Sequence, residues 1–146
     1  MTITTRPLHN EDEAQWRALW TEYLSFYEAK VSEEIYQSTF KRLIDPARPQ
    51  QVCFVAEKDR TLIGLVHAIC HPHNWRIEDV CYLQDLYVAP QTRGTGTGRI
   101  LIEAVYEAAD ANGTPTVYWM TQDFNERARK LYDRIASLTP FVKYSR

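Results

Sequence analysis

Residues 80–99 read VCYLQDLYVAPQTRGTGTGR, and this stretch decides the fold. Its first part, 80–88, is rich in apolar and aromatic side chains and stops before Pro90, which predicts a strand. A helix is predicted to follow at about 97–111, with Asn112-Gly113 as its stop signal. Three of the chain's five glycines, at positions 94, 96 and 98, lie between the two. The stretch therefore predicts a strand, a glycine loop and a helix in direct succession.

The glycine loop has the chemistry of a phosphate site. Glycine lets backbone N–H groups approach a ligand closely, and a helix N-terminus carries unpaired N–H groups and a partial positive charge. Arg93 and Arg99 add two cations, and no acidic residue lies between Gln91 and Ile102. We therefore predict that the loop binds a phosphate compound, most simply a pyrophosphate. The plain alternative is a glycine turn without a ligand.

Two common nucleotide motifs do not fit this loop. A P-loop needs a lysine followed by Ser or Thr directly after its last glycine, and no such lysine is present here. A dinucleotide fingerprint needs a third glycine where this chain has Arg99 or Leu101. Both nucleotide interpretations therefore fail on spacing.

The rest of the chain predicts a single mixed α/β domain over residues 1–146. Apolar residues at spacings of three and four predict a helix through Trp16–Tyr27, and Ser32 is the expected N-cap of the next helix. Asp123 and Glu126 form a capping-box pattern for the last helix. In chain order we expect a strand at 2–6, the helix through Trp16–Tyr27, a helix at 32–44, strands at 51–57, 61–70 and 80–88, a helix at 97–111, a strand at 116–120, the last helix, and a strand after Pro140.

Composition excludes several classes of protein. The 146 residues carry a formal net charge of −2, which argues against a dedicated DNA-binding domain. The sequence has no apolar run long enough to span a membrane and no apolar signal core at its start, so we expect a cytoplasmic protein with no membrane partner. Cys53, Cys70 and Cys81 are not spaced as a zinc site, so reduced thiols are expected. The histidine-rich segment 67–73 lacks a supporting ligand set, and no metal is expected there.

Three motifs together resemble the GNAT superfamily of N-acetyltransferases. Arg93-x-x-Gly96-x-Gly98 is similar to the acetyl-CoA pyrophosphate loop of that family. The preceding YLQDLYVAP and the later WMTQDFNERARKLYDRIA resemble the strand and helix that flank the loop. The element order also matches, so the resemblance covers nearly the whole chain. It is nearest to the branch that includes polyamine acetyltransferases and the fungal histone, polyamine and D-amino-acid acetyltransferases.

The resemblance implies both a fold and a co-substrate. The fold is a central mixed, mostly antiparallel, twisted sheet flanked by about four helices, in which the strands at 80–88 and 116–120 splay apart. The pantetheine arm of acetyl-CoA would enter the splay and pair with backbone groups of Leu86, Tyr87 and Val88, with the N–H of Val88 facing the acetyl carbonyl. Asn125 matches a position that often contacts the cofactor. The pyrophosphate would lie on the loop residues, which are Arg93, Gly94, Thr95, Gly96, Thr97, Gly98 and Arg99.

The same resemblance implies a general acid but leaves the general base open. Tyr132 matches the tyrosine that protonates the leaving thiolate, and its alternative is a core tyrosine on an apolar helix face. Gln84 stands where related polyamine enzymes often carry Glu, and a glutamine cannot accept a proton at neutral pH. Asp85 is the candidate that we retain, with a structural carboxylate as its alternative. The other candidates are Glu78, Asp79, His71, His73 and water-linked routes.

Two details concern the walls of the predicted site. Strict alternation along 80–88 places Leu83 with Asp85 and Tyr87 on one face, and Gln84 with Leu86 on the other. In the family, Gly-Phe is common before the last strand, whereas this chain has Pro140-Phe141. This departure is expected to alter the wall of the acceptor site.

The acceptor is expected to be an amine. Residues 9–34 hold seven acidic and two basic residues, and in the family the first two helices border the acceptor cleft. An acidic border favours a cation by its field, although a solvated helix face is the alternative. Substrate contacts are predicted for Tyr27, Glu28 and Gln84, and Tyr23, Phe26 and Tyr36 are further candidates for the cleft wall.

Three functions remain open at this point. The first is an acetyl-CoA-dependent N-acetyltransferase in which a small amine, polyamine, amino acid or Lys-bearing peptide attacks the thioester directly in a ternary complex. The second is a non-catalytic acyl-CoA sensor or partner-binding module. The third is a transferase for a longer acyl group. No nucleic-acid partner is expected, and a homodimer is expected because family members often pair through C-terminal strands.

Overall fold

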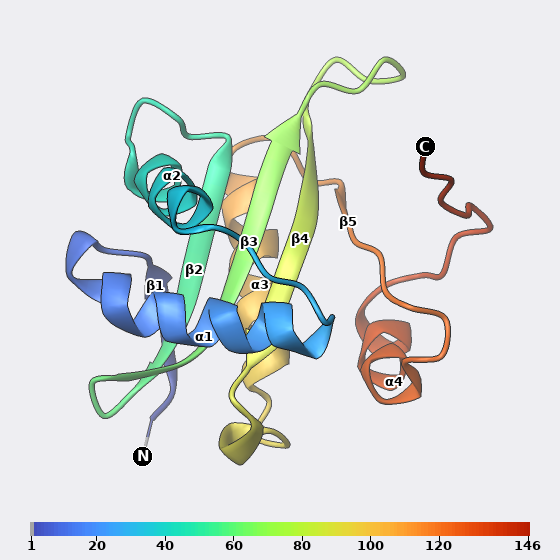
Figure 1. Ribbon diagram of the computed structural model, residues 1–146. Coiled ribbons are helices and arrows are strands. Elements are labelled where there is room, and N and C mark those ends of the chain that lie inside the picture. The colour runs from blue at the N-terminus through green and yellow to red at the C-terminus, as the bar shows by residue number, and fades with distance from the viewer. Residues whose placement is uncertain (1) are drawn as a thin grey trace.

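One five-stranded sheet organises the chain. The computed structural model describes residues 2–146, which form an α/β fold (Figure 1). The strands are β1 (Thr4–Pro7), β2 (Gln51–Lys58), β3 (Thr61–His71), β4 (Val80–Val88) and β5 (Val117–Tyr118). The helices are α1 (Glu13–Phe26), α2 (Glu33–Ile44), α3 (Thr97–Ala111) and α4 (Glu126–Ile135), with 3-10 turns at Asn10–Asp12 and Pro90–Thr92.

The sheet is mixed and mostly antiparallel, as predicted. Its order is β1-β2-β3-β4-β5, and the first four strands pair antiparallel. β5 pairs with β4 in parallel, and the pairing covers only Cys81 with Val117 and Tyr82 with Tyr118. Beyond that point the chain after β5 turns away toward α4, as Figure 1 shows. β4 and β5 therefore form the splayed pair, and the second half of β4 has one free edge.

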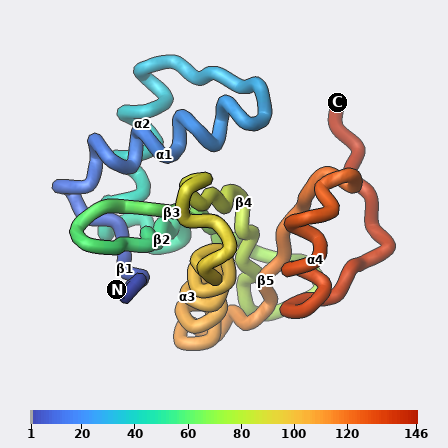
Figure 2. Tube along the Cα trace, turned by 90° about the horizontal axis from the view of Figure 1, so that it is seen from below, coloured from blue at the N-terminus to red at the C-terminus, as the bar shows by residue number. Residues whose placement is uncertain are grey.

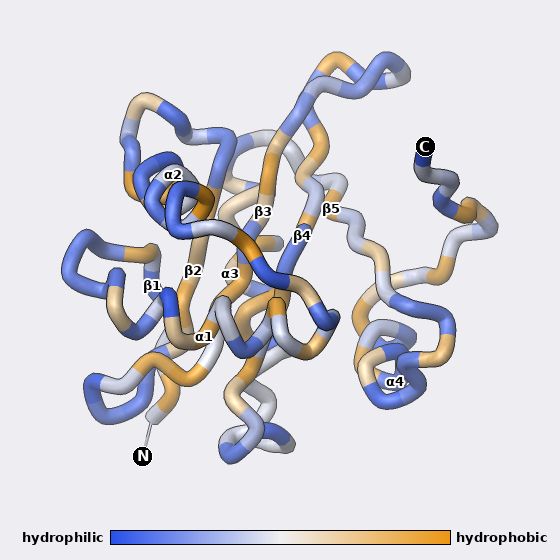
Figure 3. Tube along the Cα trace, in the orientation of Figure 1, coloured by the Kyte–Doolittle hydropathy of each residue, from blue (hydrophilic) through white to orange (hydrophobic). Residues whose placement is uncertain are grey.

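Helices cover both faces of the sheet. Figure 2 shows α1 and α2 on one face and α3 on the other, with α4 beside β5. The strands between these layers are the hydrophobic part of the trace (Figure 3). Leu65 and Val66 are neighbours on β3 and are fully buried in opposite cores, the first under Trp16 and its surroundings, the second with Leu101 and Ile102 of α3. This division follows from the two-residue period of a strand.

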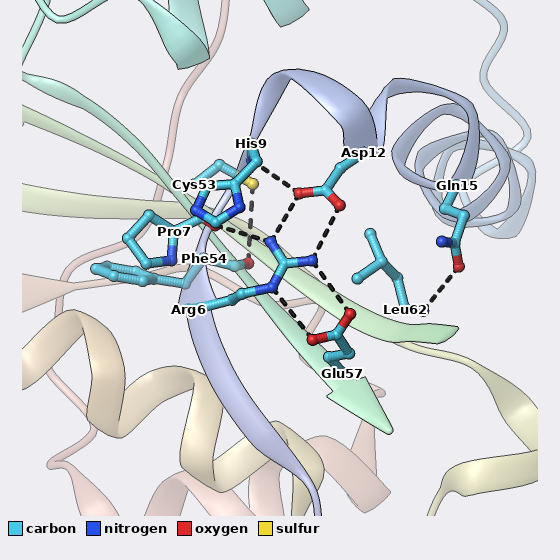
Figure 4. Close-up of polar contacts among 9 residues, drawn as sticks. All are labelled: Arg6, Pro7, His9, Asp12, Gln15, Cys53, Phe54, Glu57 and Leu62. Carbon is cyan, nitrogen blue, oxygen red and sulfur yellow. Dashed lines mark hydrogen bonds and ion pairs between the residues drawn. The ribbon is translucent and has the colours of Figure 1, made fainter. Parts of the chain in front are cut away.

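An ionic clamp fixes the start of α1 on the sheet edge. Arg6 of β1 donates to both oxygens of Asp12, at 2.8 and 3.0 Å, and to Glu57 of β2 at 3.3 Å (Figure 4). The backbone N–H of His9 donates to Asp12 at 2.7 Å. These donors hold the pKa of Asp12 below its usual value. α1 carries aromatic residues toward the place where β4 and β5 separate. The clamp therefore also sets the position of these aromatic residues.

A bulge in β4 changes which side chains share a face of the strand, compared with the prediction. In the register with β3, His67 lies opposite Asp85 and Ala68 lies opposite Leu83, so Gln84 has no partner of its own. The extra residue reverses the alternation at that point. Leu83 packs with Leu86 on the α3 side, whereas Asp85 contacts residues of α1. The expectation that Leu83 shares a face with Asp85 is therefore wrong, because strict alternation does not allow for a bulge.

The C-terminal third departs from the predicted elements in three places. The strand expected at 116–120 is reduced to Val117–Tyr118, and residues 136–146 contain no strand although one was expected after Pro140. The N-cap of α4 is Asn125, not Asp123. Ser32 is confirmed as the N-cap of α2, where its hydroxyl accepts from the N–H of Ile35 at 3.3 Å. Within residues 2–146, no helix is both long enough and apolar enough to cross a membrane.

Candidate active site

A small pocket lies where β4 and β5 separate. Its volume is ≈ 30 Å³, and its walls come from α1, β4, the segment after β5 and α4. The lining residues are Tyr23, Tyr27, Leu83, Gln84, Leu86, Trp119, Met120, Thr121 and Tyr132. Four of the residues predicted for catalysis, cofactor binding or acceptor binding are brought together here, namely Tyr27, Gln84, Leu86 and Tyr132. Among the lining residues there is no charged side chain, so the pocket itself is neutral and aromatic.

The free edge of β4 runs from this pocket toward the glycine loop. The N–H of Ala89 donates to the carbonyl of Ile63 in β3, which shows that this residue faces the paired edge of β4. Since backbone groups of alternate residues point to opposite edges, Leu86 and Val88 face the split. The carbonyl of Val88 accepts from Arg93 Nε at 3.2 Å. An extended chain can therefore add to this edge as a further strand would, through the backbone groups of Leu86 and the N–H of Val88.

The glycine loop ends in an exposed helix N-terminus. Gly94 and Gly96 have φ angles of 82° and 81°, in the left-handed region that L side chains rarely adopt. A Cβ built on either glycine would meet nothing within 4 Å, so the loop leaves open space on its outer side. Gly96 is the N-cap of α3, and the first intrahelical bond is made by Ile100 to the carbonyl of Gly96. The N–H groups of residues 97–99 thus remain available, and the loop fits an anionic phosphate group.

Side chains brace the loop from within. Thr95 donates to the carbonyl of Thr92 at 2.6 Å and is hydrogen-bonded to the buried Thr97 hydroxyl at 2.7 Å. The Arg93 guanidinium lies over the ring of Tyr87, 5.7 Å from its centre. Arg99 is exposed and pairs loosely with Glu103 at 3.6 Å. Thr95 and Thr97 therefore shape the loop, while Arg93 and Arg99 keep cations at its surface.

Tyr132 forms one wall of the pocket from α4. Its ring packs edge-on against Trp119, with the ring centroids 5.4 Å apart. Burial raises the pKa of its phenol above the usual value, and Tyr27 adds a smaller effect. Tyr132 therefore stays protonated across the neutral range. Tyr132 packs against the core cluster on the α3 side, as a core tyrosine would, and it also lines the pocket.

Asp85 is held in a buried polar network on the other wall. His67 Nδ1 lies 2.8 Å from Asp85 Oδ2, and Trp20 Nε1 donates to the same oxygen at 3.2 Å. The side chains of His67 and Asp85 are only 5% and 12% exposed. Among the described residues, both of these donors use Oδ2, which leaves Oδ1 able to accept a further proton or hydrogen bond. Asp85 also contributes to the raised pKa of Tyr23, which places that pocket residue beside the carboxylate.

The partners of His67 determine its tautomer. The indole N–H of Trp16 points at His67 Nε2 over 3.0 Å, and an indole can only donate. Nε2 is therefore the acceptor, so the ring proton is on Nδ1 and is donated to Asp85. In the other tautomer, the Nε2–H of His67 would point at the indole N–H of Trp16, and no hydrogen bond would form. The histidine thus orients the Asp85 carboxylate.

Sequence reasoning missed most of this network. The helix periodicity predicts a helix through Trp16–Tyr27 but no polar role for its tryptophans, and the base candidates predicted among the histidines are His71 and His73. The signal for His67 exists only in the strand register, which requires the bulge at Gln84. A sequence pattern alone does not show that His67 lies opposite Asp85, because this depends on how β3 pairs with β4.

The other base candidates lie elsewhere. His71 donates from Nδ1 to the carbonyl of Pro72 and lies 2.7 Å from the Tyr118 hydroxyl, at the far end of β3. His73 contacts the backbone of Trp75 in the loop that follows. Neither is among the residues of the pocket. The structure therefore does not bring these histidines to the split.

The acidic segment 9–34 is partly neutralised. Asp12 pairs with Arg6, and Glu13 and Glu33 both pair with Arg17, at 3.1 and 2.7 Å. Glu28 is exposed just after α1, with a φ of 56°, and does not line the pocket. Tyr36 is hydrogen-bonded to Thr21 and packs on Trp20, so it belongs to the helix interface. Part of the segment is therefore structural.

Asn125 lies at the start of α4, near the pocket. Its side-chain amide donates to Thr121 Oγ1 at 3.3 Å, and Thr121 lines the pocket. Its role in the structure is to begin the helix and tie it to the segment after β5. Among residues 2–146 there is no group of three or more His, Cys, Asp or Glu residues arranged to hold a metal ion.

Comparison with known families and proteins gives a consistent result. Residues 13–136 match the model of the acetyltransferase (GNAT) family. The D-amino-acid N-acetyltransferase HPA3 of Saccharomyces cerevisiae is 39% identical over 145 residues, covering 99% of this chain and 90% of the yeast protein. Thialysine N-epsilon-acetyltransferase of Bos taurus is 35% identical over 92 residues, which cover 63% of this chain and 49% of the bovine protein.

Solved structures share the fold. The aminoglycoside acetyltransferase AAC(6')-Iy, in complex with the bisubstrate analogue CoA-S-monomethyl-acetylneamine, superposes with a TM-score of 0.87 over 100% of this chain and 98% of the other. The sequence identity is 19%, so this likeness concerns the arrangement of the elements alone.

Proposed function

This chain belongs to the GNAT acetyltransferase family and is an acetyl-CoA-dependent N-acetyltransferase, and from that premise we propose that it acetylates a primary amine by direct attack in a ternary complex. One observation carries the proposal. The free edge of β4 leads from a pocket containing Tyr132 to the open glycine loop at the start of α3. The pocket would then hold the thioester of acetyl-CoA, and the glycine loop would hold its pyrophosphate.

Residues of β4 and the loop would hold acetyl-CoA. When bound, it supplies an activated acetyl thioester. The N–H groups of residues 97–99 and the surface cations Arg93 and Arg99 would face its pyrophosphate. Leu86 and Val88 would pair with the pantetheine arm. Since Leu86 lines the pocket, we assign the N–H toward the acetyl carbonyl to Leu86 in place of Val88, as a preorganised donor for the developing oxyanion.

Tyr132 would be the general acid. It lines the pocket, it is protonated at neutral pH, and its ring is fixed by Trp119. A fixed phenol beside the thioester can give its proton to the sulfur as the carbon–sulfur bond breaks. Tyr132 would then recover a proton from solvent before the next turnover.

Asp85 would be the final acceptor of the amine proton, acting through Tyr23. Tyr23 lines the pocket and lies beside Asp85, whereas Asp85 itself does not line it. In this route the ammonium gives a proton to the Tyr23 oxygen while the Tyr23 hydroxyl proton passes to Asp85 Oδ1. His67 and Trp20 hold the carboxylate in place through Oδ2. The amine becomes neutral and can attack the thioester.

The acceptor class follows from the charges around the pocket. The lining holds aromatic rings of Tyr23 and Tyr27, Gln84 and no cationic side chain, with the Asp85 carboxylate behind it. Aromatic faces and a nearby anion favour a cationic amine. We therefore propose a small amine, a polyamine end or a lysine-like side chain as the acceptor. An acceptor carboxylate would have no positive partner in the pocket.

A homodimer is proposed from the C-terminal segment. Leu138, Phe141, Val142 and Tyr144 are each at least 76% exposed, and the outer edge of β5 has no partner strand within residues 2–146. A second copy that covers this segment would remove apolar surface from water. Light scattering of the purified protein measures the mass directly, and a strictly monomeric mass at micromolar concentration would contradict the proposal.

The activity is tested with a panel of amines. Purified protein is incubated with acetyl-CoA and spermidine, diamines, D- and L-lysine, their methyl esters, aminoglycosides or lysine peptides, and products are identified by mass spectrometry. We expect acetylation, with each lysine methyl ester turned over faster than the free amino acid. Binding of acetyl-CoA without any turnover would favour the sensor alternative, and faster turnover of the free amino acids would overturn the proposed acceptor class.

A further inference from the structure

Two cysteines face each other across neighbouring strands. Cys70 of β3 lies directly opposite Cys81 of β4 in the antiparallel register. The Cys70 N–H donates to the carbonyl of Gln50, before β2, and the Cys81 N–H donates to Thr116, before β5. Both residues thus turn their N–H groups away from each other. They form a non-hydrogen-bonded pair of the ladder, the kind in which opposite side chains are closest.

This geometry is compatible with a disulfide. Opposite residues of such a pair have Cα atoms about 4.5 Å apart, and a disulfide spans Cα separations of about 4.4–6.8 Å. Register partners also project from the same face of the sheet. Both cysteines line one pocket of ≈ 220 Å³ between the sheet and the C-terminal half of α3. Cys81 is buried, with Sγ 3.4 Å from Thr114 Oγ1, while Cys70 is half-buried and reachable from the pocket.

We propose that Cys70 and Cys81 form a dithiol site that reacts with disulfide-class oxidants, such as oxidised glutathione, to give a cross-strand disulfide. The thiolate of Cys70 attacks one sulfur of the oxidant and releases one thiol. The thiolate of Cys81 then attacks the Cys70 sulfur, forms the cross-strand bond and releases the second thiol. The protein gives up two electrons and two protons, and the oxidant is reduced to two thiols.

The surroundings of Cys70 set the rate of this reaction. Burial, with Cys81 and the carboxylate of Asp79 as further causes, raises the pKa of Cys70 to about 12. Only the thiolate attacks a disulfide, so the first step is slow at neutral pH. Its rate is expected to rise about tenfold per pH unit over the mildly alkaline range. The Cys70–Cys81 pair is therefore expected to be oxidised slowly at neutral pH.

Cys53 provides an internal control. It lies opposite His67 on the neighbouring strand and is 3% exposed, so it has no cysteine partner. The three thiols also fall in separate tryptic peptides, because Arg60 lies between Cys53 and Cys70 and Arg76 lies between Cys70 and Cys81. Each possible link is therefore distinguishable by peptide mass.

The test uses the full chain, reduced and then freed of reductant. It is incubated with oxidised glutathione at several pH values, blocked with an alkylating agent, and measured by intact mass and tryptic mapping. We expect the wild type and Cys53→Ser to lose two hydrogens and to yield a peptide joining residues 61–76 to 77–93. Cys70→Ser should not react, and Cys81→Ser, with Cys81→Ala as a second variant if the serine form is unstable, should stop at a glutathione adduct on Cys70.

Two results would overturn the proposal. One is a wild-type protein in which glutathione adducts accumulate on Cys70 with no cross-strand peptide. The other is a link that involves Cys53 or that survives in Cys70→Ser. Because neither readout uses acetyl transfer, the outcome is independent of the proposed function.

Discussion

At the scale of single residues, the two walls of the split carry different proton chemistry. Tyr132 sits in an aromatic wall, where burial raises the pKa of its phenol, and Asp85 sits among N–H donors from His67 and Trp20. The proposed proton donor therefore lines the pocket from α4, and the proposed proton acceptor, Asp85, lies behind Tyr23 on the α1 side. The first two predictions separate these roles.

Replacing Tyr132 by phenylalanine removes the proton donor but keeps the ring that packs on Trp119. We expect kcat to fall by about 10²-fold or more, because a positioned general acid contributes about that much. Acetyl-CoA affinity, measured by calorimetry, should be nearly unchanged. The matched control is Tyr106→Phe, which removes a hydroxyl bonded to the carbonyl of Ile135 outside the pocket. Equal turnover in the two variants across pH 6–9 would remove Tyr132 from the mechanism.

Replacing Asp85 by asparagine keeps an oxygen for His67 and Trp20 but removes the proton acceptor. We expect kcat to fall by about 10²-fold with little change in the melting temperature. The loss should be smaller at high pH, where more of the amine is already neutral. Asp79→Asn is the control, since that carboxylate lies just before β4 and does not line the pocket. A loss in Asp85→Asn that is the same at every pH would point to a purely structural carboxylate.

Among the elements, the junction of β4, the glycine loop and α3 sets the geometry of the proposed acetyl-CoA site. The strand supplies a free edge because β5 leaves it after two pairs. The helix supplies N–H groups because its first turn begins at a glycine with a left-handed backbone. Both the free strand edge and the helix N-terminus would bind the ligand through backbone groups, so neither requires a particular side chain there.

The loop prediction compares two glycines. Gly96→Val and Gly113→Val both force a side chain onto a left-handed backbone, at φ angles of 81° and 75°, with no neighbour within 4 Å. Each should cost about 1–2 kcal/mol of stability through backbone strain. Only Gly96→Val places a side chain where the pyrophosphate is proposed to lie, so only this variant should weaken acetyl-CoA binding, by about tenfold or more. Equal affinities in calorimetry would contradict the loop assignment.

At the scale of the whole molecule, α1 depends on the ionic clamp at the sheet edge. Arg6, Asp12 and Glu57 join β1, the turn before α1 and β2. Gln15 adds a bond from its side-chain oxygen to the N–H of Leu62 at 2.8 Å. A helix fixed at this end delivers Tyr23 and Tyr27 to the pocket at its other end.

The stability prediction concerns Asp12. Asp12→Asn should lower the free energy of unfolding by about 2 kcal/mol at pH 7, because it removes charge-assisted bonds made by a buried carboxylate. The pKa of Asp12 is lowered by Arg6 in the folded protein, so its contribution is present above the unfolded pKa and is lost as pH falls through the folded one. The difference between wild type and variant in urea unfolding should therefore shrink below about pH 4.

Glu57→Gln is the control for this experiment. Its contact with Arg6 is longer, at 3.3 Å, and its side chain is 28% exposed, compared with 8% for Asp12. A smaller loss of stability is expected because solvent screens the exposed pair. A loss equal to that of Asp12→Asn would show that the clamp does not depend on burial.

Most of the elements, and the loop proposed to bind the co-substrate, were predictable from local sequence patterns. The strand at 80–88, the glycine loop and the helix at 97–111 were predictable because each has a local cause: apolar composition, positive-φ residues and helix periodicity. The family resemblance then implied the splayed strands. It also implied the pocket tyrosine, because Tyr132 lies in a continuous motif.

Only the tertiary structure decided what surrounds Asp85 and which strands end early. The bulge at Gln84 reverses the faces of β4, and the pairing of β3 with β4 brings His67 to Asp85 and Cys70 to Cys81. The strand expected after Pro140 did not form: residues 136–146 pair with no strand, and the outer edge of β5 stays open within residues 2–146. Register and partner availability are non-local quantities, fixed by the packing of distant segments, and local sequence patterns do not encode them.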